Sequence, residues 1–149
     1  MMPDRQIILT RLIAAPPEVV WRCWTDPAIL PQWFGPEGFQ CDTKDIDLRQ
    51  GGLWRFDMIG TDGKVWRNRH RFTLHDAPHR LEFLLDDDSD DAEPMAVVVE
   101  LVAQDGGTRI TQTMTFPTAA MRDGALGFGA DRLGQTTLAK LAAQARALI

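Results

Sequence analysis

The sequence has no tyrosine, only two cysteines and no excess of positive charge. Cys23 and Cys41 are too few for a disulfide framework or a four-ligand metal site. Sixteen lysines and arginines against 21 aspartates and glutamates leave a net charge of −5, the wrong sign for a chain whose main partner is nucleic acid. No apolar run approaches the roughly 20 residues of a membrane span, and Met1–Thr10 shows no signal-peptide pattern. We therefore expect a cytoplasmic protein with no nucleic-acid partner and no membrane insertion.

Sequence motifs for the commonest catalytic centres are also missing. The chain has no Cys-x-x-Cys, no Gly-x-Ser-x-Gly and no phosphate-binding loop. The glycine-rich stretch 124–129 neither follows a strand nor carries the lysine of a nucleotide loop, so we interpret it as a flexible approach to the last helix. We predict no cofactor and no metal site, and we assign no catalytic residue.

Residue periodicity predicts one α+β domain over residues 1–149. A β-branched run predicts a strand at Gln6–Ile13, and two short helices follow, one ending near Thr25 and one at Ala28–Trp33. From Phe39 onward the period changes to two, which predicts a series of antiparallel strands. These are 53–59, 65–74, a strand around 81–85, and a last hairpin formed by 95–103 and 108–116. After Pro117 the apolar spacing predicts one long helix to the C-terminus.

Acidic residues are concentrated in one segment, 86–93. Its like charges repel one another and it has little apolar surface to bury, so we expect an exposed loop between strands.

Large aromatic residues recur on one face of the predicted sheet, opposite a last helix rich in alanine. Aromatic side chains that face alanines can interlock with them as a solid core. They can also leave an apolar cavity of the kind that binds small molecules. A cavity between the sheet and the last helix would be lined by residues on the inward positions of both: Trp54, Phe56, Trp66, Asn68, His70, Phe72, Phe83, Gln112, Met114, Phe116, Leu133 and Leu138.

His70 is the candidate for chemistry in that cavity. Its parity places it with Asn68 and Phe72 on the aromatic face, where an imidazole beside an amide orients a ligand or transfers a proton. The alternative is a histidine at the sheet edge that bonds to backbone or water. His75 and His79 flank a turn and are expected to be solvated.

Five arginines alternate with the aromatic residues and therefore lie on the outer face of the same strands: Arg55, Arg67, Arg69, Arg71 and Arg109. One interpretation is a solvated face with cross-strand ion pairs to Asp57, Glu82 and Glu100. The other is a docking surface for an acidic partner.

Several ordered motifs resemble those of one protein family. They are the segments Ala15–Trp21, Trp24–Pro27, Gln32–Pro36, Asp47–Phe56, Asp62–Gly63, Pro78–Leu81 and Gly107–Ile110. Together they resemble the bacterial homologues of the activator of heat-shock-protein ATPase, in the START-like (SRPBCC) superfamily. The likeness extends over most of the chain.

This resemblance implies a helix-grip fold, in which a curved antiparallel sheet wraps around a long C-terminal helix and encloses a hydrophobic ligand cavity. Relatives include lipid carriers, hormone-binding proteins, polyketide cyclases and a domain of eukaryotic co-chaperones. The chain departs from the family pattern at Leu133-Gly134, where Gly-Trp is common. The resemblance assigns no catalytic residue to this chain, because the positions that match the family motifs have structural roles.

Three functions follow as hypotheses. The first is binding of a small apolar or aromatic molecule, and the second is a cyclase or hydrolase that uses His70 with Asn68 or Gln112. The third is a co-chaperone-like domain whose partner is a chaperone, which we rank lowest because the family's stimulating activity depends on a longer protein. A homodimer is a further alternative, with exposed residues of 30–34 buried in its interface.

Overall fold

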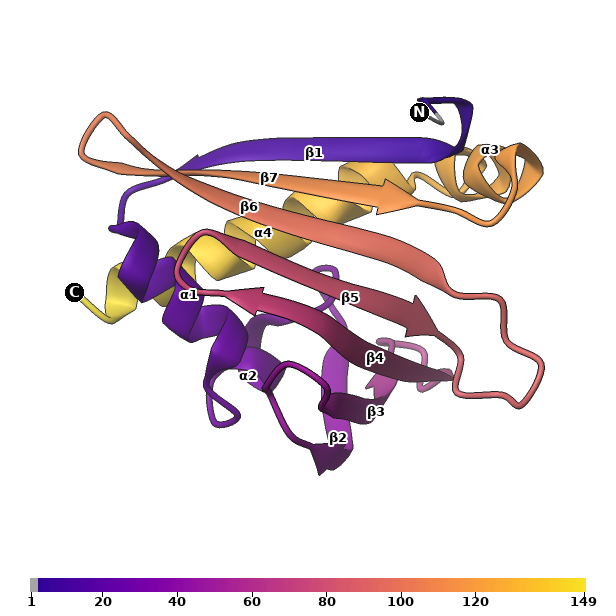
Figure 1. Ribbon diagram of the computed structural model, residues 1–149. Coiled ribbons are helices and arrows are strands. Elements are labelled where there is room, and N and C mark those ends of the chain that lie inside the picture. The colour runs from indigo at the N-terminus through magenta and orange to yellow at the C-terminus, as the bar shows by residue number, and fades with distance from the viewer. Residues whose placement is uncertain (1–2) are drawn as a thin grey trace.

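The computed structural model describes residues 3–149, and its elements follow the predicted order (Figure 1). The strands are β1 (Gln6–Ile13), β2 (Gln40–Ile46), β3 (Leu53–Ile59), β4 (Val65–Asp76), β5 (Arg80–Asp86), β6 (Met95–Gln104) and β7 (Gly107–Thr115). The helices are a short 3-10 turn η1 (Pro3–Arg5), then α1 (Pro17–Thr25), α2 (Leu30–Trp33), α3 (Ala119–Gly127) and α4 (Ala130–Ala147).

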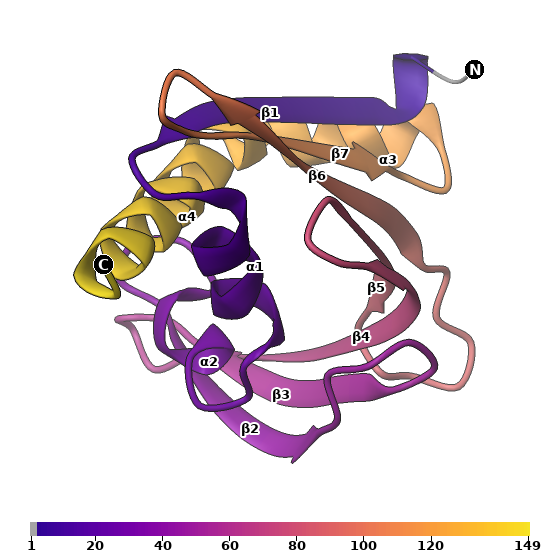
Figure 2. The same cartoon turned by 60° about the vertical axis from the view of Figure 1, so that its left-hand side comes forward.

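All seven strands form one antiparallel sheet in the order β1-β7-β6-β5-β4-β3-β2. The sheet curls, and α1, α2 and α4 lie on its concave side (Figure 2). Helix α4 packs against β1 and against α1 and α2. This is the α+β helix-grip architecture that the sequence predicts, with a curved sheet around a long C-terminal helix.

Local sequence explains where the elements begin and turn. Pro16 is the N-cap of α1 and Pro17 its first residue, a position where the missing N–H costs no helical hydrogen bond. The β6–β7 hairpin turns at Asp105 and Gly106, with φ values of 52° and 79°. Such left-handed conformations are those that Asp and Gly tolerate best.

The region after Pro117 differs from the prediction, because it forms two helices where we expected one. The side chain of Thr118 accepts a hydrogen bond from the Met121 N–H and so caps α3. Gly129, at φ 81°, then separates α3 from α4. The stretch 124–129, interpreted as a flexible approach, is therefore largely helical.

The expectation that residues 30–34 are exposed is also corrected by the structure. Leu30 and Trp33 are almost fully buried within the single chain, and the Trp33 indole N–H donates to the Cys23 carbonyl at 2.9 Å. Leu30 and Trp33 belong to the core of the domain and do not supply the exposed apolar surface on which the homodimer hypothesis rested, and the homodimer stays a prediction.

Within the described residues, no helix combines the length and the apolar character that a membrane crossing requires.

Candidate functional site

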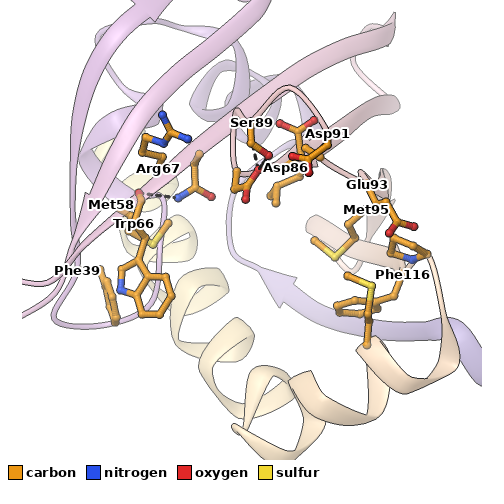
Figure 3. A pocket seen from close by; sticks show the side chains of 16 residues that line it. Phe39, Met58, Trp66, Arg67, Asp86, Ser89, Asp91, Glu93, Met95 and Phe116 are labelled. Atoms are coloured by element: carbon orange, nitrogen blue, oxygen red, sulfur yellow. Dashed lines mark hydrogen bonds between the residues drawn. The ribbon is translucent and has the colours of Figure 1, made fainter.

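A pocket of about 680 Å³ opens at one end of the sheet (Figure 3). It lies where β3 ends and β4 begins, beside the loop between β5 and β6, and it reaches the first turn of α3. Pockets that hold small molecules usually have volumes of about 300–1,000 Å³, so this one has the size of a ligand site.

Apolar side chains lie on two sides of the pocket, with Phe39, Met58 and Trp66 on one and Met95 and Phe116 on the other (Figure 3). The apolar lining residues come from seven segments: Phe39, Met58, Trp66, Leu85, Met95, Phe116, Pro117 and Met121. Trp66 is about half exposed, and the Lys64 ammonium lies 4.0 Å from the centre of its ring. The pocket thus presents a mainly hydrophobic surface to solvent.

The polar part of the lining comes mostly from the β5–β6 loop. Its residues are Arg67, Asn68, Asp86, Asp87, Ser89, Asp91 and Glu93, and Ala92 of the same loop also lines the pocket. The Asn68 amide donates to the Trp66 carbonyl of the same strand at 3.1 Å.

Asp86 fixes the start of that loop. Its carboxylate receives two hydrogen bonds from Arg69, at 3.0 and 2.8 Å, and one from Arg71 at 3.0 Å. Burial alone would raise the Asp86 pKa, but hydrogen bonds from Arg69 and from the Asp88 N–H, with both arginine charges, hold it below its ordinary value. The prediction that segment 86–93 is wholly exposed is therefore wrong at Asp86, which is buried at the end of β5.

The structure divides the predicted cavity residues into three groups. Trp66, Asn68 and Phe116 line the pocket. Trp54, Phe56, His70, Phe72 and Phe83 lie deeper on the same sheet face, fully buried. They pack as a ring cluster in which Trp54 and Phe56 stack at 3.7 Å and His70 and Phe83 at 4.5 Å. These five residues form core and do not line the pocket.

Helices α1 and α2 explain why the cluster is solid. Phe34, directly after α2, inserts its ring among the others, 5.5 Å from Trp54 and 4.9 Å from His70. Trp24 of α1 fills the neighbouring space and contacts Phe83 and Trp33. The large residues predicted on the sheet therefore meet large residues on the helices, where we expected small alanines.

The third group lies farther along the domain. Gln112 and Met114 of β7 are half-buried, opposite Leu9 and Ile7 of β1, and Leu133 and Leu138 belong to α4. None of the four lines the pocket. At the site of the departure from the family pattern, a Cβ on Gly134 would collide with the Leu9 side chain, so glycine there lets α4 approach β1 closely.

His70 lies in the middle of the sheet, so the alternative of an edge histidine bonded to backbone or water is not what the structure shows. Within residues 3–149 neither ring nitrogen has a hydrogen-bond partner. Burial lowers the His70 pKa to about 3, although the Asp86 charge opposes that shift. At neutral pH the ring is uncharged and enclosed by other rings, away from the pocket wall.

The other two histidines differ from each other. His75 is half-buried, with its ring 5.3 Å from Phe72 and 5.8 Å from Trp21, and burial lowers its pKa. The expectation of a solvated side chain therefore fails for His75, whereas His79 is exposed.

Both cysteines have raised pKa values. Burial raises the pKa of Cys23 to about 11 and that of Cys41 to about 12, so both thiols are protonated at neutral pH and are poor nucleophiles. Cys41, only half-buried, donates to the Phe34 carbonyl at 3.3 Å.

The outer face carries ion pairs, but with other partners than those predicted. Arg69 and Arg71 pair with Asp86, while Arg55 reaches Asp45 at 3.0 Å and Asp88 at 2.8 Å. The three predicted acids pair elsewhere, Asp57 with Lys44 and both Glu82 and Glu100 with Arg80.

Strand parity could have found two of the pocket residues that the prediction missed. Met58 comes two residues after Phe56 on β3, and Leu85 comes two residues after Phe83 on β5. Residues two apart on a strand point to the same face, so Met58 and Leu85 share the inward face. The loop residues Asp87, Asp91 and Glu93 carry no periodic signal. Only the path of the chain between β5 and β6 brings them to the pocket.

Fold and site together define a helix-grip protein, with a curved antiparallel sheet, a long C-terminal helix and a pocket that opens at one end. The model of one family, described as Activator of Hsp90 ATPase homolog 1-like protein, matches residues 14–145. The chain belongs to this family.

Solved structures agree with that assignment. Protein Ms6760 from Mycobacterium smegmatis is 27% identical, with a TM-score of 0.87, and the match covers 100% of this chain and 96% of that one. Protein NE0264 from Nitrosomonas europaea is 26% identical with the same TM-score of 0.87, covering 98% and 97%. The AHSA1 protein from Silicibacter pomeroyi, at 23% identity and a TM-score of 0.76, shares the fold over 97% and 99% of the two chains. A search of curated proteins finds no match.

Proposed function

We propose that the protein binds a small hydrophobic or aromatic molecule in the pocket at the end of the sheet. The observation that carries this proposal is the apolar wall of a ligand-sized pocket, made by Phe39, Trp66, Phe116 and three methionines. Flexible, polarisable methionines adapt to ligands of irregular shape. The helix-grip fold, whose relatives include carriers of hydrophobic molecules, supports the same function.

The catalytic alternative gains no support from the site. It needed His70 to share a cavity with Asn68 or Gln112, but only Asn68 lines the pocket. No other observation favours a reaction there, and we retain binding as the proposal.

Docking of a chaperone or other acidic partner stays a prediction, as does a cytoplasmic location. Three of the five outer arginines, Arg55, Arg69 and Arg71, already pair with aspartates. Their positive charge is therefore compensated within the domain, which reduces what the face offers to an acidic surface.

A substitution that fills the pocket tests the proposal. Met95 and Val102 lie on the same strand, β6, but only Met95 lines the pocket, whereas Val102 is 47% exposed outside it. Titration of N-phenylnaphthylamine, a neutral dye that fluoresces in apolar surroundings, should give saturable binding to the unmodified protein. We expect Met95→Trp to weaken it at least about tenfold, the loss of a few well-packed apolar contacts.

Val102→Trp is the matched control and should leave dye affinity unchanged. Thermal unfolding of both variants establishes that each is folded. Equal affinity of the folded Met95→Trp variant and the unmodified protein would refute the pocket as the binding site. Native mass spectrometry of freshly purified protein would add the mass of any molecule that co-purifies.

A further inference from the structure

The charges around the pocket are strongly unbalanced. Among its carboxylates, Asp86 is matched by two arginines, but Asp87, Asp91 and Glu93 form no ion pair with any residue in 3–149. The Asp87 pKa is lowered, chiefly by a hydrogen bond from the Ser89 hydroxyl, so this group is ionised at neutral pH. Three uncompensated carboxylates thus border an apolar pocket.

One basic side chain, Arg67, belongs to the lining and could oppose them. Alternation along β4 puts Arg67 on the opposite side of the strand from Trp66 and Asn68, and Figure 3 shows its guanidinium directed away from the Trp66 ring. With Arg67 turned away, the charged lining residues left for a ligand include Asp87, Asp91 and Glu93, which are exposed to solvent.

The apolar wall is itself suited to positive charge. The faces of aromatic rings carry partial negative charge and attract cations. The Trp66 ring already does so, since the Lys64 ammonium lies 4.0 Å from its centre. The carboxylates and the aromatic rings of the lining therefore favour a ligand of the same sign, a positive one.

A metal ion does not account for these acids. Among the described residues, no three histidine, cysteine or acidic side chains are placed to hold one. The carboxylates instead line a space of about 680 Å³, which suits an organic molecule.

We propose that the pocket selects amphipathic organic cations, molecules with an aromatic or aliphatic body and a protonated amine. The body packs against Trp66, Phe116 and the methionines, while the ammonium group lies beside Asp91 and Glu93. This inference rests on the proposed function, because it assigns a charge to the ligand of the same pocket.

Three probes with one apolar body separate charge from hydrophobicity: naphthylmethylammonium, naphthalenemethanol and naphthylacetate. By calorimetry at low ionic strength, we expect the cation to bind about five- to tenfold more tightly than the neutral alcohol, and the anion to bind more weakly than the alcohol. In about 1 M salt, where the screening length falls to roughly 3 Å, the advantage of the cation should shrink toward zero.

Paired variants locate the effect. Asp91→Asn combined with Glu93→Gln should remove the advantage of the cation without changing affinity for the alcohol. The control combines Asp90→Asn with Asp105→Asn, which removes the same charge from two exposed residues outside the pocket lining. We expect the control to retain at least half of the logarithmic advantage, because neither Asp90 nor Asp105 lines the pocket.

The outcomes are distinct. If the alcohol binds and the cation binds no better, the charge preference is refuted and the hydrophobic pocket stands. Tighter binding of the anion would also refute it and would point to Arg67. If none of the three probes binds and the dye fails as well, both proposals fall.

Discussion

At one end of the concave sheet face, the rings of β3, β4 and β5 meet rings from α1 and α2. At the other end, residues of the same strands face the β5–β6 loop, Phe39, Phe116 and the first turn of α3 across an open pocket. The inward pattern is continuous along β4, yet His70 is fully buried while Trp66, four residues earlier, is about half exposed. Whether an aromatic sheet face becomes core or pocket therefore depends on what the opposing segments supply.

Phe34 is the residue whose loss should change the closed end most. Its ring contacts Trp24, Trp33, Trp54, Phe56 and His70, and Phe34→Ala would leave a cavity among them. We expect a loss of about 3–4 kcal/mol in the free energy of unfolding, measured by urea denaturation.

Phe128→Ala is the matched control, since Phe128 is 84% exposed and its loss should cost less than about 0.5 kcal/mol. If the two alanine variants were equally stable, Phe34 would not hold the closed end together.

Asp86 joins the two ends, because it is buried in the sheet and also begins the loop of the pocket. Asp86→Asn removes the charge that Arg69 and Arg71 share. We expect a loss of about 2–3 kcal/mol, somewhat below the cost of breaking a fully buried ion pair, because both arginines are partly exposed. Urea denaturation measures this loss, with Asp90→Asn as the control, whose free energy of unfolding should be nearly unchanged. Similar losses in both variants would mean that the Asp86 carboxylate does not stabilise the domain through its ion pairs.

His70 makes the closed end sensitive to acid. Its folded pKa is about 3 and its ordinary value is 6.5, so between these limits the unfolded chain binds a proton that the folded protein does not. Stability therefore falls as pH falls below 6.5. Between about pH 7.5 and pH 5, the unmodified protein should lose about 2 kcal/mol more than His70→Leu.

His79→Leu, at an exposed position, should keep the pH dependence of the unmodified protein. Unfolding curves measured across that pH range decide the matter. Parallel profiles for His70→Leu and the unmodified protein would show that His70 is not the group responsible.

The open end should tolerate change best. Asp91→Asn combined with Glu93→Gln alters two side chains without an ion partner among the described residues, so stability should change by less than about 0.5 kcal/mol. Thermal unfolding measures it, and a clear rise in melting temperature would reveal mutual repulsion between the carboxylates.

Much of the fold follows from periodicity. The bounds of β1 and β3 agree with the prediction to the residue, since alternation and flanking turn residues mark both. Helix α3 was missed because Gly124 and Gly127, which lie within it, were interpreted as part of a flexible approach to the last helix.

The site was harder to predict. Alternation places Trp54 and Trp66 on the same face, but it carries no information about Phe34, which reaches across the interior from α2 and fills the space beside Trp54. The acids of the β5–β6 loop likewise depend on the path of the chain. Side-chain direction is a local property, whereas an empty volume is set by segments distant in sequence.

Trp66 gives the protein an optical reporter of its own. Of the five tryptophans, Trp24, Trp33 and Trp54 are buried and Trp21 is half-buried, so Trp66 is the most hydrated indole. A molecule that entered beside it would displace water and shift its emission to shorter wavelength, so occupancy can be followed without any label.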